Sequence, residues 1–388
     1  MAREKYKGGR SHAETVDRKG LGRLRRSAEK PVGRESNWEG RHEDDTFVES
    51  HGHRERPSHT GERLIARFNR LAGLGAAQSA PGVAGEISGT EGNGLLVRTS
   101  AGEFPASVRR SLTKRIGGVR NPLAVGDRVH VLPPGDDPDS PSTSGVVTAV
   151  EPRRNQLERV DSHNRSLVHV IAANLDLLLV TAAVATPEPR AGLIDRYLLL
   201  AAWCGIPAVL VLTKCDLVPA ASVTELAAIW RTVVPVHTLA LVGDDPGLVA
   251  LRTFLQGKSC VICGQSGVGK STLVNALFPG TGARIGGVAD AGHGRHTTVS
   301  ARSYLLPGDG RLIDTPGVRE CGVAGLTPVD VALHYPDLAR HQPHCRFADC
   351  THRHEPDCAV LAARDRGEIA ASRYASYLSI VDEDLETR

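Results

Sequence analysis

The chain has 388 residues, of which 40% are hydrophobic, 23% are charged and only 4% are aromatic. This length exceeds what one hydrophobic core usually organises, so it predicts two or three domains with cores built from aliphatic side chains. A formal net charge of +3 excludes a histone-like basic protein and leaves room for a local basic surface.

Two apolar stretches, 167–186 and 191–213, are long enough to be considered as membrane spans. Each is interrupted by charge, at Asp176 in the first and at Asp195 in the second, whereas a spanning helix needs roughly 20 residues with almost no charge. The N-terminus lacks the apolar segment of a signal peptide. Eight cysteines are not a disulfide framework, and three of them lie close together beside histidines. We therefore expect a cytoplasmic protein that makes no membrane contact.

Residues 1–80 are polar, mixed in charge and rich in Gly, Arg, His and Ser. Helical spacing of apolar residues occurs only at Leu64, Ile65, Phe68 and Leu71. Such a segment cannot bury enough apolar surface to offset the entropy of ordering it. We expect a disordered charged tail with one short helix at its end, serving either as a solvated extension or as an RNA-binding arm.

Residues 81–160 show short strand patterns separated by Gly-, Asn- and Pro-containing turns. The expected strands cover residues 82–88, 94–99, 103–108, 128–131 and 146–150. Five strands in so short a segment predict a small β-barrel of the OB type.

The stretch 109–128 within this barrel is strongly basic. It contains a single acid, Asp127, and the basic residues Arg109, Arg110, Lys114, Arg115, Arg120 and Arg128. Such a run is either a solvated face or a surface that contacts RNA phosphates. Phe104 is the only aromatic residue of the barrel, which argues against stacking on single-stranded bases and favours contact with the backbone of folded RNA.

Residues 161–323 alternate apolar runs with helical patterns, which is typical of a doubly wound α/β domain with a parallel sheet. The expected elements are strands over 176–184, 206–212 and 259–263 and helices over 192–204, 222–232 and 246–256. Residues 324–388 are polar, contain Cys and His, and predict a helical domain.

A glycine-rich motif at residues 264–271 follows the strand expected over 259–263. It matches G-x-x-x-x-G-K-[ST] and precedes a helix expected over 272–278. The glycines allow backbone N–H groups to surround phosphate oxygens at a helix N-terminus. We expect Lys270 to reach the β- and γ-phosphates and Ser271 to bind Mg²⁺. The predicted nucleotide-binding residues are Gly264, Gln265, Ser266, Gly267, Val268, Gly269, Lys270, Ser271 and Thr272.

Two shorter motifs follow the phosphate loop. The segment 314–317 has the form D-x-x-G after a strand expected over 311–313; there, Asp314 holds Mg²⁺ through its hydration shell and the Gly317 amide senses the γ-phosphate. A Gly-rich loop with the sequence Gly-Arg-His-Thr-Thr lies between the two motifs. We expect Thr298 in this loop to close over Mg²⁺ only when the γ-phosphate is present.

A guanine-recognition motif of the form [N/T]-K-x-D lies upstream of the phosphate loop. Its residues are Thr213, Lys214, Cys215 and Asp216, directly after an apolar strand. A carboxylate at Asp216 can accept from the ring N1–H and the exocyclic amine of guanine. Ordinary GTPases carry this motif downstream, but a cyclic permutation preserves the geometry, since the carboxyl ends of the strands share one edge. The alternative is a chance tetrapeptide at a strand end.

Three cysteines and a histidine near the C-terminus have the spacing of a zinc site, C-x4-C-x-H-x5-C. Cys345, Cys350, His352 and Cys358 are suitable ligands for tetrahedral Zn²⁺. Four protein ligands leave no open position, so we expect one structural site. The other candidates for the histidine ligand are His341, His344 and His354.

The order of these motifs resembles that of one family, the circularly permuted ribosome-biogenesis GTPases called RsgA or YjeQ. The loop 265–271 and the Pro-Glu-Pro-Arg segment 187–190 add to the match, which extends from about residue 81 to the C-terminus. The resemblance implies an OB domain, a permuted GTPase domain and a zinc-binding domain. It also implies GTP hydrolysis stimulated by the small ribosomal subunit and its rRNA during late maturation, coupled to release. We expect the chain to be a monomer.

The sequence departs from the GTPase pattern at two places. The segment 236–240 reads Val-His-Thr-Leu-Ala where a Ser-Ala type motif usually backs the guanine. Ras-like GTPases carry a Gln after D-x-x-G that orients the attacking water, whereas this chain has Val318. We expect slow turnover in isolation and His296 of the Gly-rich loop as the catalytic group, unless that imidazole only packs or contacts RNA. The alternative functions are an RNA-binding module with a non-hydrolysing nucleotide site and a P-loop ATPase in which Asp216 has no role.

Overall fold

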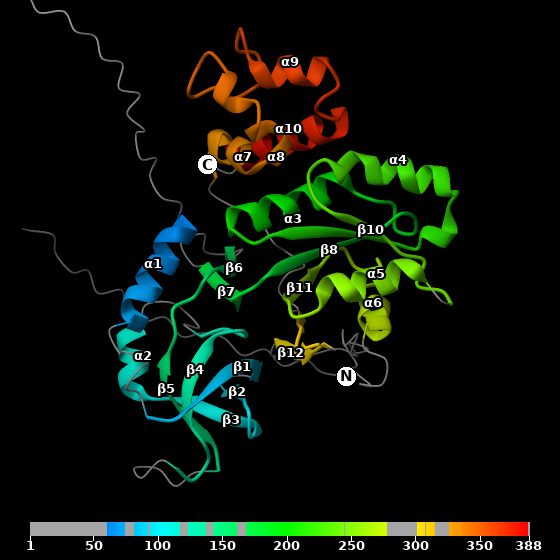
Figure 1. Cartoon of the computed structure of the whole chain (residues 1–388). Helices are drawn as coiled ribbons and strands as arrows, with labels where there is room; N and C mark the ends of the chain where they lie inside the picture. Colours follow the sequence, from blue (N-terminus) through cyan, green and yellow to red (C-terminus); the bar gives the residue numbers. More distant parts are fainter. Residues whose placement is uncertain are drawn as a thin grey trace, which may run out of the picture. The chain divides into compact units, whose positions relative to one another are not determined.

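The computed structural model describes residues 60–73, 81–91, 94–116, 123–136, 143–160, 168–243, 245–277, 301–306, 308–314 and 326–386 (Figure 1). No helix within these ranges combines the length and the apolar character that crossing a membrane requires.

A closed five-stranded barrel occupies the region predicted to be an OB-type barrel. Its strands are β1 (Val83–Glu91), β2 (Gly94–Thr99), β3 (Gly102–Val108), β4 (Arg128–Leu132) and β5 (Gly145–Val150). The pairing runs β1–β2–β3–β5–β4 and closes from β4 back to β1, with only β3–β5 parallel. Alternate residues such as Val129 and Val131 face a common apolar core, as period-2 alternation requires. The predicted barrel is confirmed.

Helix α1 (Thr60–Gly73) packs on this barrel. Phe68 and Ala72 are buried in the barrel core, and the Asn69 side chain bonds both the amide and the carbonyl of Arg153 at 2.7 and 2.8 Å. The Arg153 guanidinium lies 3.7 Å from the centre of the Phe68 ring. A short helix was expected at the end of the N-terminal tail, and α1 lies there. Its packing on the barrel was not expected; the barrel supplies the apolar partner that an isolated helix lacks. Residues 1–59 and 74–80 of that prediction lie outside the described residues.

A six-stranded arrangement follows in the order β10-β9-β8-β11-β13-β12. Its strands are β8 (Leu177–Ala183), β9 (Ala208–Thr213), β10 (Val236–Thr238), β11 (Ser259–Cys263), β12 (Arg302–Leu305) and β13 (Arg311–Asp314). All pairs are parallel except β12 with β13. The predicted α/β domain is confirmed, whereas β10 and β12 were not predicted because three- and four-residue strands carry almost no periodic signal.

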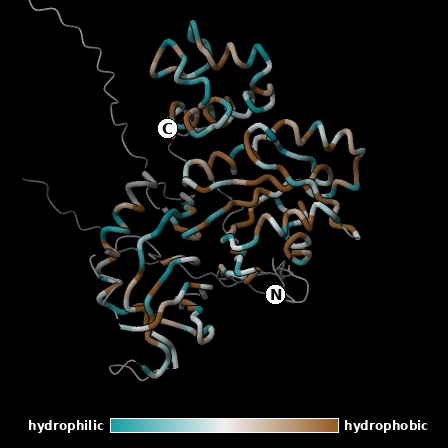
Figure 2. The backbone as a smooth tube through the Cα atoms, in the orientation of Figure 1, coloured by the Kyte–Doolittle hydropathy of each residue, from teal (hydrophilic) through white to brown (hydrophobic). Residues whose placement is uncertain are grey.

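Two helical layers cover the sheet. Helices α3 (Ala191–Trp203) and α4 (Ala220–Arg231) pack on one face, and α5 (Pro246–Leu255) and α6 (Lys270–Leu277) pack on the other. Leu178 and Val180 of β8 face the first layer, while Leu177 and Leu179 face the second. Both faces of the central strands are buried, so these strands appear as continuous hydrophobic segments in Figure 2.

A hairpin of β6 (Gln156–Val160) and β7 (Val168–Ala173) precedes β8. It was not predicted, because polar residues interrupt its apolar pattern. Two of these polar residues, Gln156 and Glu158, are nevertheless buried, and a chain of hydrogen bonds connects them to Arg153. Arg153 donates to Gln156 at 2.8 Å, and Gln156 donates to Glu158 at 3.0 Å. Burial raises the pKa of Glu158.

The C-terminal region is helical, as predicted. Its elements are α7 (Pro328–His334), α8 (Pro336–Ala339), the 3-10 turn η4 (Gln342–His344), α9 (Ala359–Asp365) and α10 (Ala371–Glu386). A capping box begins α7, in which the Thr327 hydroxyl accepts from the Asp330 amide and the Asp330 side chain accepts from the Thr327 amide. Leu199 of α3 belongs to the same hydrophobic core as these helices.

A buried cluster of charges joins α3 to the C-terminal helices. The Asp195 carboxylate accepts hydrogen bonds from Trp230 at 2.7 Å, from Tyr335 at 2.8 Å and from Arg373. The same Arg373 guanidinium donates twice to Asp337, at 2.9 and 2.5 Å. All three charged side chains are buried, so each depends on its partners to replace water.

We expect Arg373→Ala to destabilise the protein by about 3–5 kcal/mol, because it leaves two buried carboxylates without a counter-charge. Urea unfolding followed by the fluorescence of Trp230, which contacts the cluster, measures the effect. Arg373→Lys should recover only part of the loss, since an ammonium cannot donate in parallel to both carboxylates. A change below about 0.5 kcal/mol for Arg373→Ala, the range of ordinary surface substitutions, would contradict the importance of the cluster.

Candidate functional site: a nucleotide loop cluster and a Cys/His cluster

The phosphate loop runs from the end of β11 into α6. At Gly264, φ is +146°, and a Cβ there would lie 2.1 Å from the Thr181 carbonyl of β8, so only glycine fits this turn. The Lys270 ammonium donates to the carbonyls of Gly264 at 2.8 Å and Gln265 at 2.7 Å. The cation therefore lies within the curve of the loop, where a bound phosphate chain would meet it.

The guanine-recognition motif contacts the phosphate loop directly. Lys214 has φ +59°, and its ammonium donates to the Gly267 carbonyl at 2.8 Å and to the Thr186 carbonyl. The buried Thr213 hydroxyl donates to the Val268 carbonyl. Two loops that lie some 50 residues apart in the chain are thus joined at the same edge of the sheet.

Asp216 lies in a 3-10 turn, Cys215–Leu217, with its side chain exposed to solvent. The Cys215 amide donates to the carbonyl of Leu239 at 3.1 Å. The loop after β10 therefore lies beside the recognition turn, where the Ser-Ala type motif of other GTPases would be. The unusual residues of this segment are evident from the sequence, but this contact is not, because a β-strand of three residues gives no periodic signal.

Asp314 ends β13, which runs parallel to β11 with Val261 opposite Ile313. The carboxylate therefore lies at the edge of the sheet that also carries the phosphate loop. Three other predicted residues, Gly317, Thr298 and His296, lie outside the described residues.

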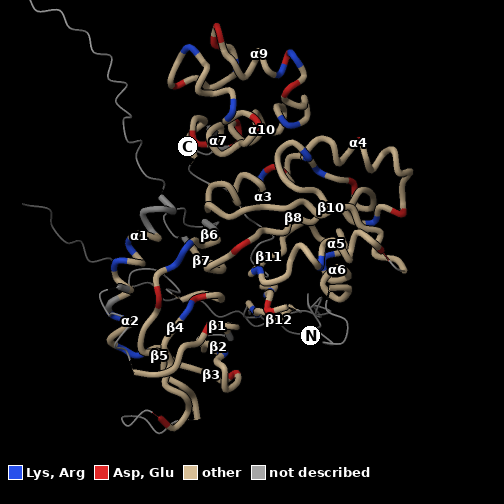
Figure 3. Tube along the Cα trace, viewed as in Figure 1, with Lys and Arg blue, Asp and Glu red and all other residues tan. Residues whose placement is uncertain are grey.

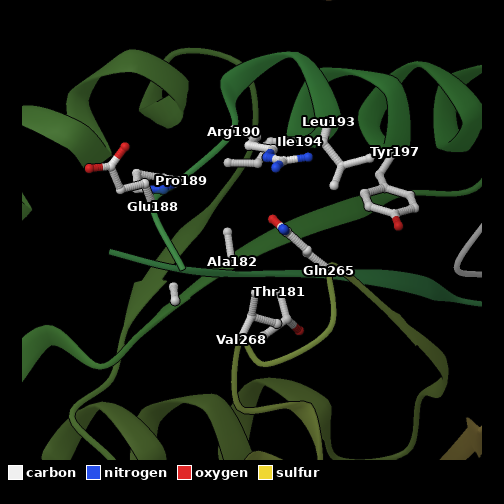
Figure 4. A pocket seen from close by; sticks show the side chains of 11 residues that line it. Thr181, Ala182, Glu188, Pro189, Arg190, Leu193, Ile194, Tyr197, Gln265 and Val268 are labelled. Carbon is white, nitrogen blue, oxygen red and sulfur yellow. The ribbon is translucent and has the colours of Figure 1, made fainter. Parts of the chain in front are cut away.

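A small cavity separates the phosphate loop from the start of α3 (Figure 4). Gln265 and Val268 line it from the loop, and Glu188 and Arg190 line it from the segment before α3. Its volume of about 10 Å³ accommodates one water molecule. The buried Thr181 hydroxyl, which has no hydrogen-bond partner among the described residues, borders this space. The cavity is too small for a substrate, so a nucleotide would have to bind along the open edge of the sheet.

The structure brings together the four predicted zinc ligands. The Sγ atoms of Cys345 and Cys358 are 3.9 Å apart, and each lies 3.6 or 3.5 Å from Nδ1 of His352. With Cys350, all four ligand atoms lie within 4.8 Å of one another. Tetrahedral zinc separates such atoms by roughly 3.5–3.8 Å, so this cluster fits the ion. Burial raises the pKa of the Cys350 thiol to about 12, and a thiolate there needs a nearby cation.

Residues around the cluster hold its loop in place. The Glu355 carboxylate accepts from the amides of Thr351, Arg353 and His354 at 2.7–3.1 Å. Burial acts to raise the pKa of Glu355, but hydrogen bonds from the Thr351 hydroxyl and from the amides of Thr351 and Arg353 hold that pKa below its ordinary value. Tyr374 of α10 donates to the carbonyl of His352 at 2.7 Å. Glu355 could not be recognised from the sequence, since an acid between two ligands looks like any polar loop residue.

The competing histidines lie outside the cluster. His344 and His354 are exposed, and His341 faces Glu368 at 3.7 Å. Among the described residues, the Cys345–Cys358 group is the one cluster of His, Cys, Asp and Glu side chains that could hold a metal ion.

Comparison with known proteins agrees with this geometry. The family model for the RsgA GTPase matches residues 150–324. A small ribosomal subunit biogenesis GTPase RsgA from Gemmatimonas aurantiaca is 40% identical over 74% of this chain and 92% of its own. The crystal structure of YjeQ from Thermotoga maritima is 29% identical, with a TM-score of 0.64 over 79% of this chain and 99% of its own.

A second solved structure bears on the fold. YloQ, a circularly permuted GTPase, is 22% identical, with a TM-score of 0.60 over 81% of this chain and 98% of its own. The motif that precedes the phosphate loop in the chain but contacts it in space agrees with such a permutation. The matching family model, the sequence identity to the relatives and the share of each chain that they cover together show that the chain belongs to the RsgA family of circularly permuted GTPases.

Proposed function

We propose that this chain hydrolyses GTP while bound to the small ribosomal subunit, that it assists late maturation of the subunit, and that hydrolysis triggers its release. The observation that carries this proposal is the contact of Lys214 with Gly267 and of Thr213 with Val268, which joins a guanine motif to a phosphate loop. The name of the relative from Gemmatimonas aurantiaca, a small ribosomal subunit biogenesis GTPase, supports the partner. We place this activity in the cytoplasm and treat the chain as a monomer.

In this proposal, residues 264–272 hold the phosphates of GTP, and Asp216 selects guanine. Ser271 and Thr298 would hold Mg²⁺ directly and Asp314 through water; the ion, when bound, neutralises charge on the phosphates. We assign residues 81–160 to RNA binding together with α1, residues 161–323 to the GTPase domain and residues 324–388 to the zinc-binding domain.

The Lys and Arg residues along α1 and α2 (Arg110–Ile116), blue in Figure 3, support a role of the barrel in RNA binding. Arg67 and Arg70 of α1 and Arg110 and Lys114 of α2 are exposed, and the two helices pack together. The packing of α1 therefore extends the basic surface that the sequence predicted for 109–128. Phosphate contact through such side chains does not depend on RNA sequence.

We expect slow GTP hydrolysis by the isolated chain and much faster hydrolysis when purified small ribosomal subunits are added, with no comparable ATP hydrolysis. His296→Ala should lower the stimulated single-turnover rate by about 10²–10⁴-fold, the usual contribution of a general acid–base. His293→Ala, in the same loop, is the matched control. Subunit binding is measured in parallel. GTP turnover that does not respond to subunits would overturn the proposed function, and stimulated turnover that survives His296→Ala would remove only the role of that residue.

We expect protein purified without chelators to contain about one zinc per chain, bound by Cys345, Cys350, His352 and Cys358, because four such ligands fill a tetrahedral site. Elemental analysis and thermal unfolding measure metal content and stability. Cys350→Ser should lose the metal and unfold the C-terminal domain, whereas His354→Ala should retain both. Anaerobically purified wild-type protein without zinc would rule out the site.

We expect the affinity for the small subunit to fall steeply with salt concentration, since each phosphate contact releases counterions. Charge reversal of Arg110 and Lys114 should lower the slope of log affinity against log salt by about 0.7–0.9 per lost contact. Arg231→Glu, at an exposed position on α4, is the control. Unchanged affinity and slope in the α2 variant would show that the barrel binds through another surface.

A further inference from the structure

The loop between β10 and α5, Leu239–Gly243, is fixed against the recognition turn. The fully buried Leu239 donates its amide to the carbonyl of Leu212 in β9 at 2.8 Å and accepts from the Cys215 amide at 3.1 Å. The start of this loop therefore cannot move independently of the strand and turn that carry Asp216.

One carboxylate holds the rest of the loop. Oδ2 of Asp245 accepts from the amides of Ala240 at 2.8 Å and Leu241 at 3.0 Å, and Oδ1 accepts from the Gly247 amide at 2.9 Å as the N-cap of α5. A Cβ at Gly247 would lie 2.4 Å from the carbonyl of Thr238, so α5 begins in close contact with β10. The loop, the helix and the strand thus meet at Asp245.

The backbone shows that this conformation is imposed. Leu241 has φ +59°, in the left-handed region that a leucine adopts only when its surroundings compensate. The hydrogen bond from the Leu241 amide to the Asp245 carboxylate provides that compensation. Val242 follows immediately, with a side chain that is 68% exposed, so the chain turns outward just after the two amides that Asp245 holds.

The loop lies close to the recognition carboxylate. Burial raises the pKa of Cys215, and the negative charges of Asp245 and Asp216 raise it further. Asp216 directly follows Cys215, whose amide donates to the Leu239 carbonyl at the start of this loop, so the loop lies beside the carboxylate that is expected to meet the base. The two amides bound by Asp245 are not free to donate to a ligand, whereas the backbone directly after them turns toward solvent.

We propose that Asp245 is a positioning residue for guanine recognition: it holds the loop so that the backbone at Val242–Gly243 donates an N–H to the carbonyl oxygen O6 of the base. In this chain, Asp245 thereby replaces the missing Ser-Ala type motif. The inference rests on the proposed function, in which Asp216 binds N1–H and the exocyclic amine. An amide donor at this position accepts guanine and hypoxanthine, which carry O6, and disfavours adenine, which presents an amine there.

Asp245→Ser tests the proposal, because serine retains the helix N-cap but has no second oxygen for the loop. We expect the Kd of GDP and the Kd of IDP to rise together by about 10-fold, equivalent to one hydrogen bond. The Kd of ADP, which lacks O6, should stay unchanged. Isothermal titration calorimetry with the full-length chain and these three nucleotides measures the pattern.

Two further variants separate the possible outcomes. Thr327→Ala removes the capping box of α7 and should lower Tm without changing any nucleotide affinity. Asp216→Asn should weaken GDP binding more than IDP binding, since IDP lacks the exocyclic amine. If Asp216→Asn changes neither affinity, the guanine site of the proposed function is wrong. If Asp216→Asn behaves as expected while Asp245→Ser leaves GDP unchanged or weakens GDP, IDP and ADP equally, only the role of Asp245 is overturned.

Discussion

Parallel hydrogen bonding among β8, β9, β11 and β13 is the constraint on which every nucleotide-binding loop of this chain depends. Parallel strands end at a common edge, so the loops that follow them meet there whatever their order along the chain. The contact of Lys214 with Gly267 shows the result, since the loop of β9 closes on the loop of β11. A permuted chain order therefore leaves the geometry of the site unchanged, provided that each strand keeps the same neighbours in the sheet.

Periodic and motif-bearing parts of the structure could be predicted from the sequence, and parts held by distant contacts could not. The barrel strands alternate and end at turn residues, and the phosphate loop is a contiguous motif, so both were recognisable. Helix α1 was missed as part of the barrel because its partner, Arg153, lies 84 residues away. Asp245 was missed because an aspartate before Pro-Gly looks like an ordinary helix cap; its bonds to Ala240 and Leu241 appear only in three dimensions. The catalytic role of His296, which lies outside the described residues, stays a prediction.

The GTPase domain and the C-terminal domain are linked through α3. This helix begins beside the cavity that Gln265 of the phosphate loop lines, and it carries Asp195 into the buried cluster with Arg373. Neighbouring residues of this helix therefore connect the two parts of the chain, since Ile194 lines the cavity beside the phosphate loop and Asp195 binds Arg373 of the C-terminal helices. The cluster also makes the connection stiff, since a shift of α3 would separate buried opposite charges.

The pairing of Asp195 with Arg373 also has a consequence for the synthesis of the chain. The two residues are 178 positions apart, and translation at 5–20 residues per second needs roughly 10–35 s to add the second after the first. During that interval, the Asp195 carboxylate of the nascent α3 lacks the Arg373 counter-charge that it needs in order to be buried. Its final packing must therefore await the synthesis of α10, even though the strand β8 that precedes α3 is made early. Vectorial synthesis thus delays completion of the buried charge cluster until α10 has been made.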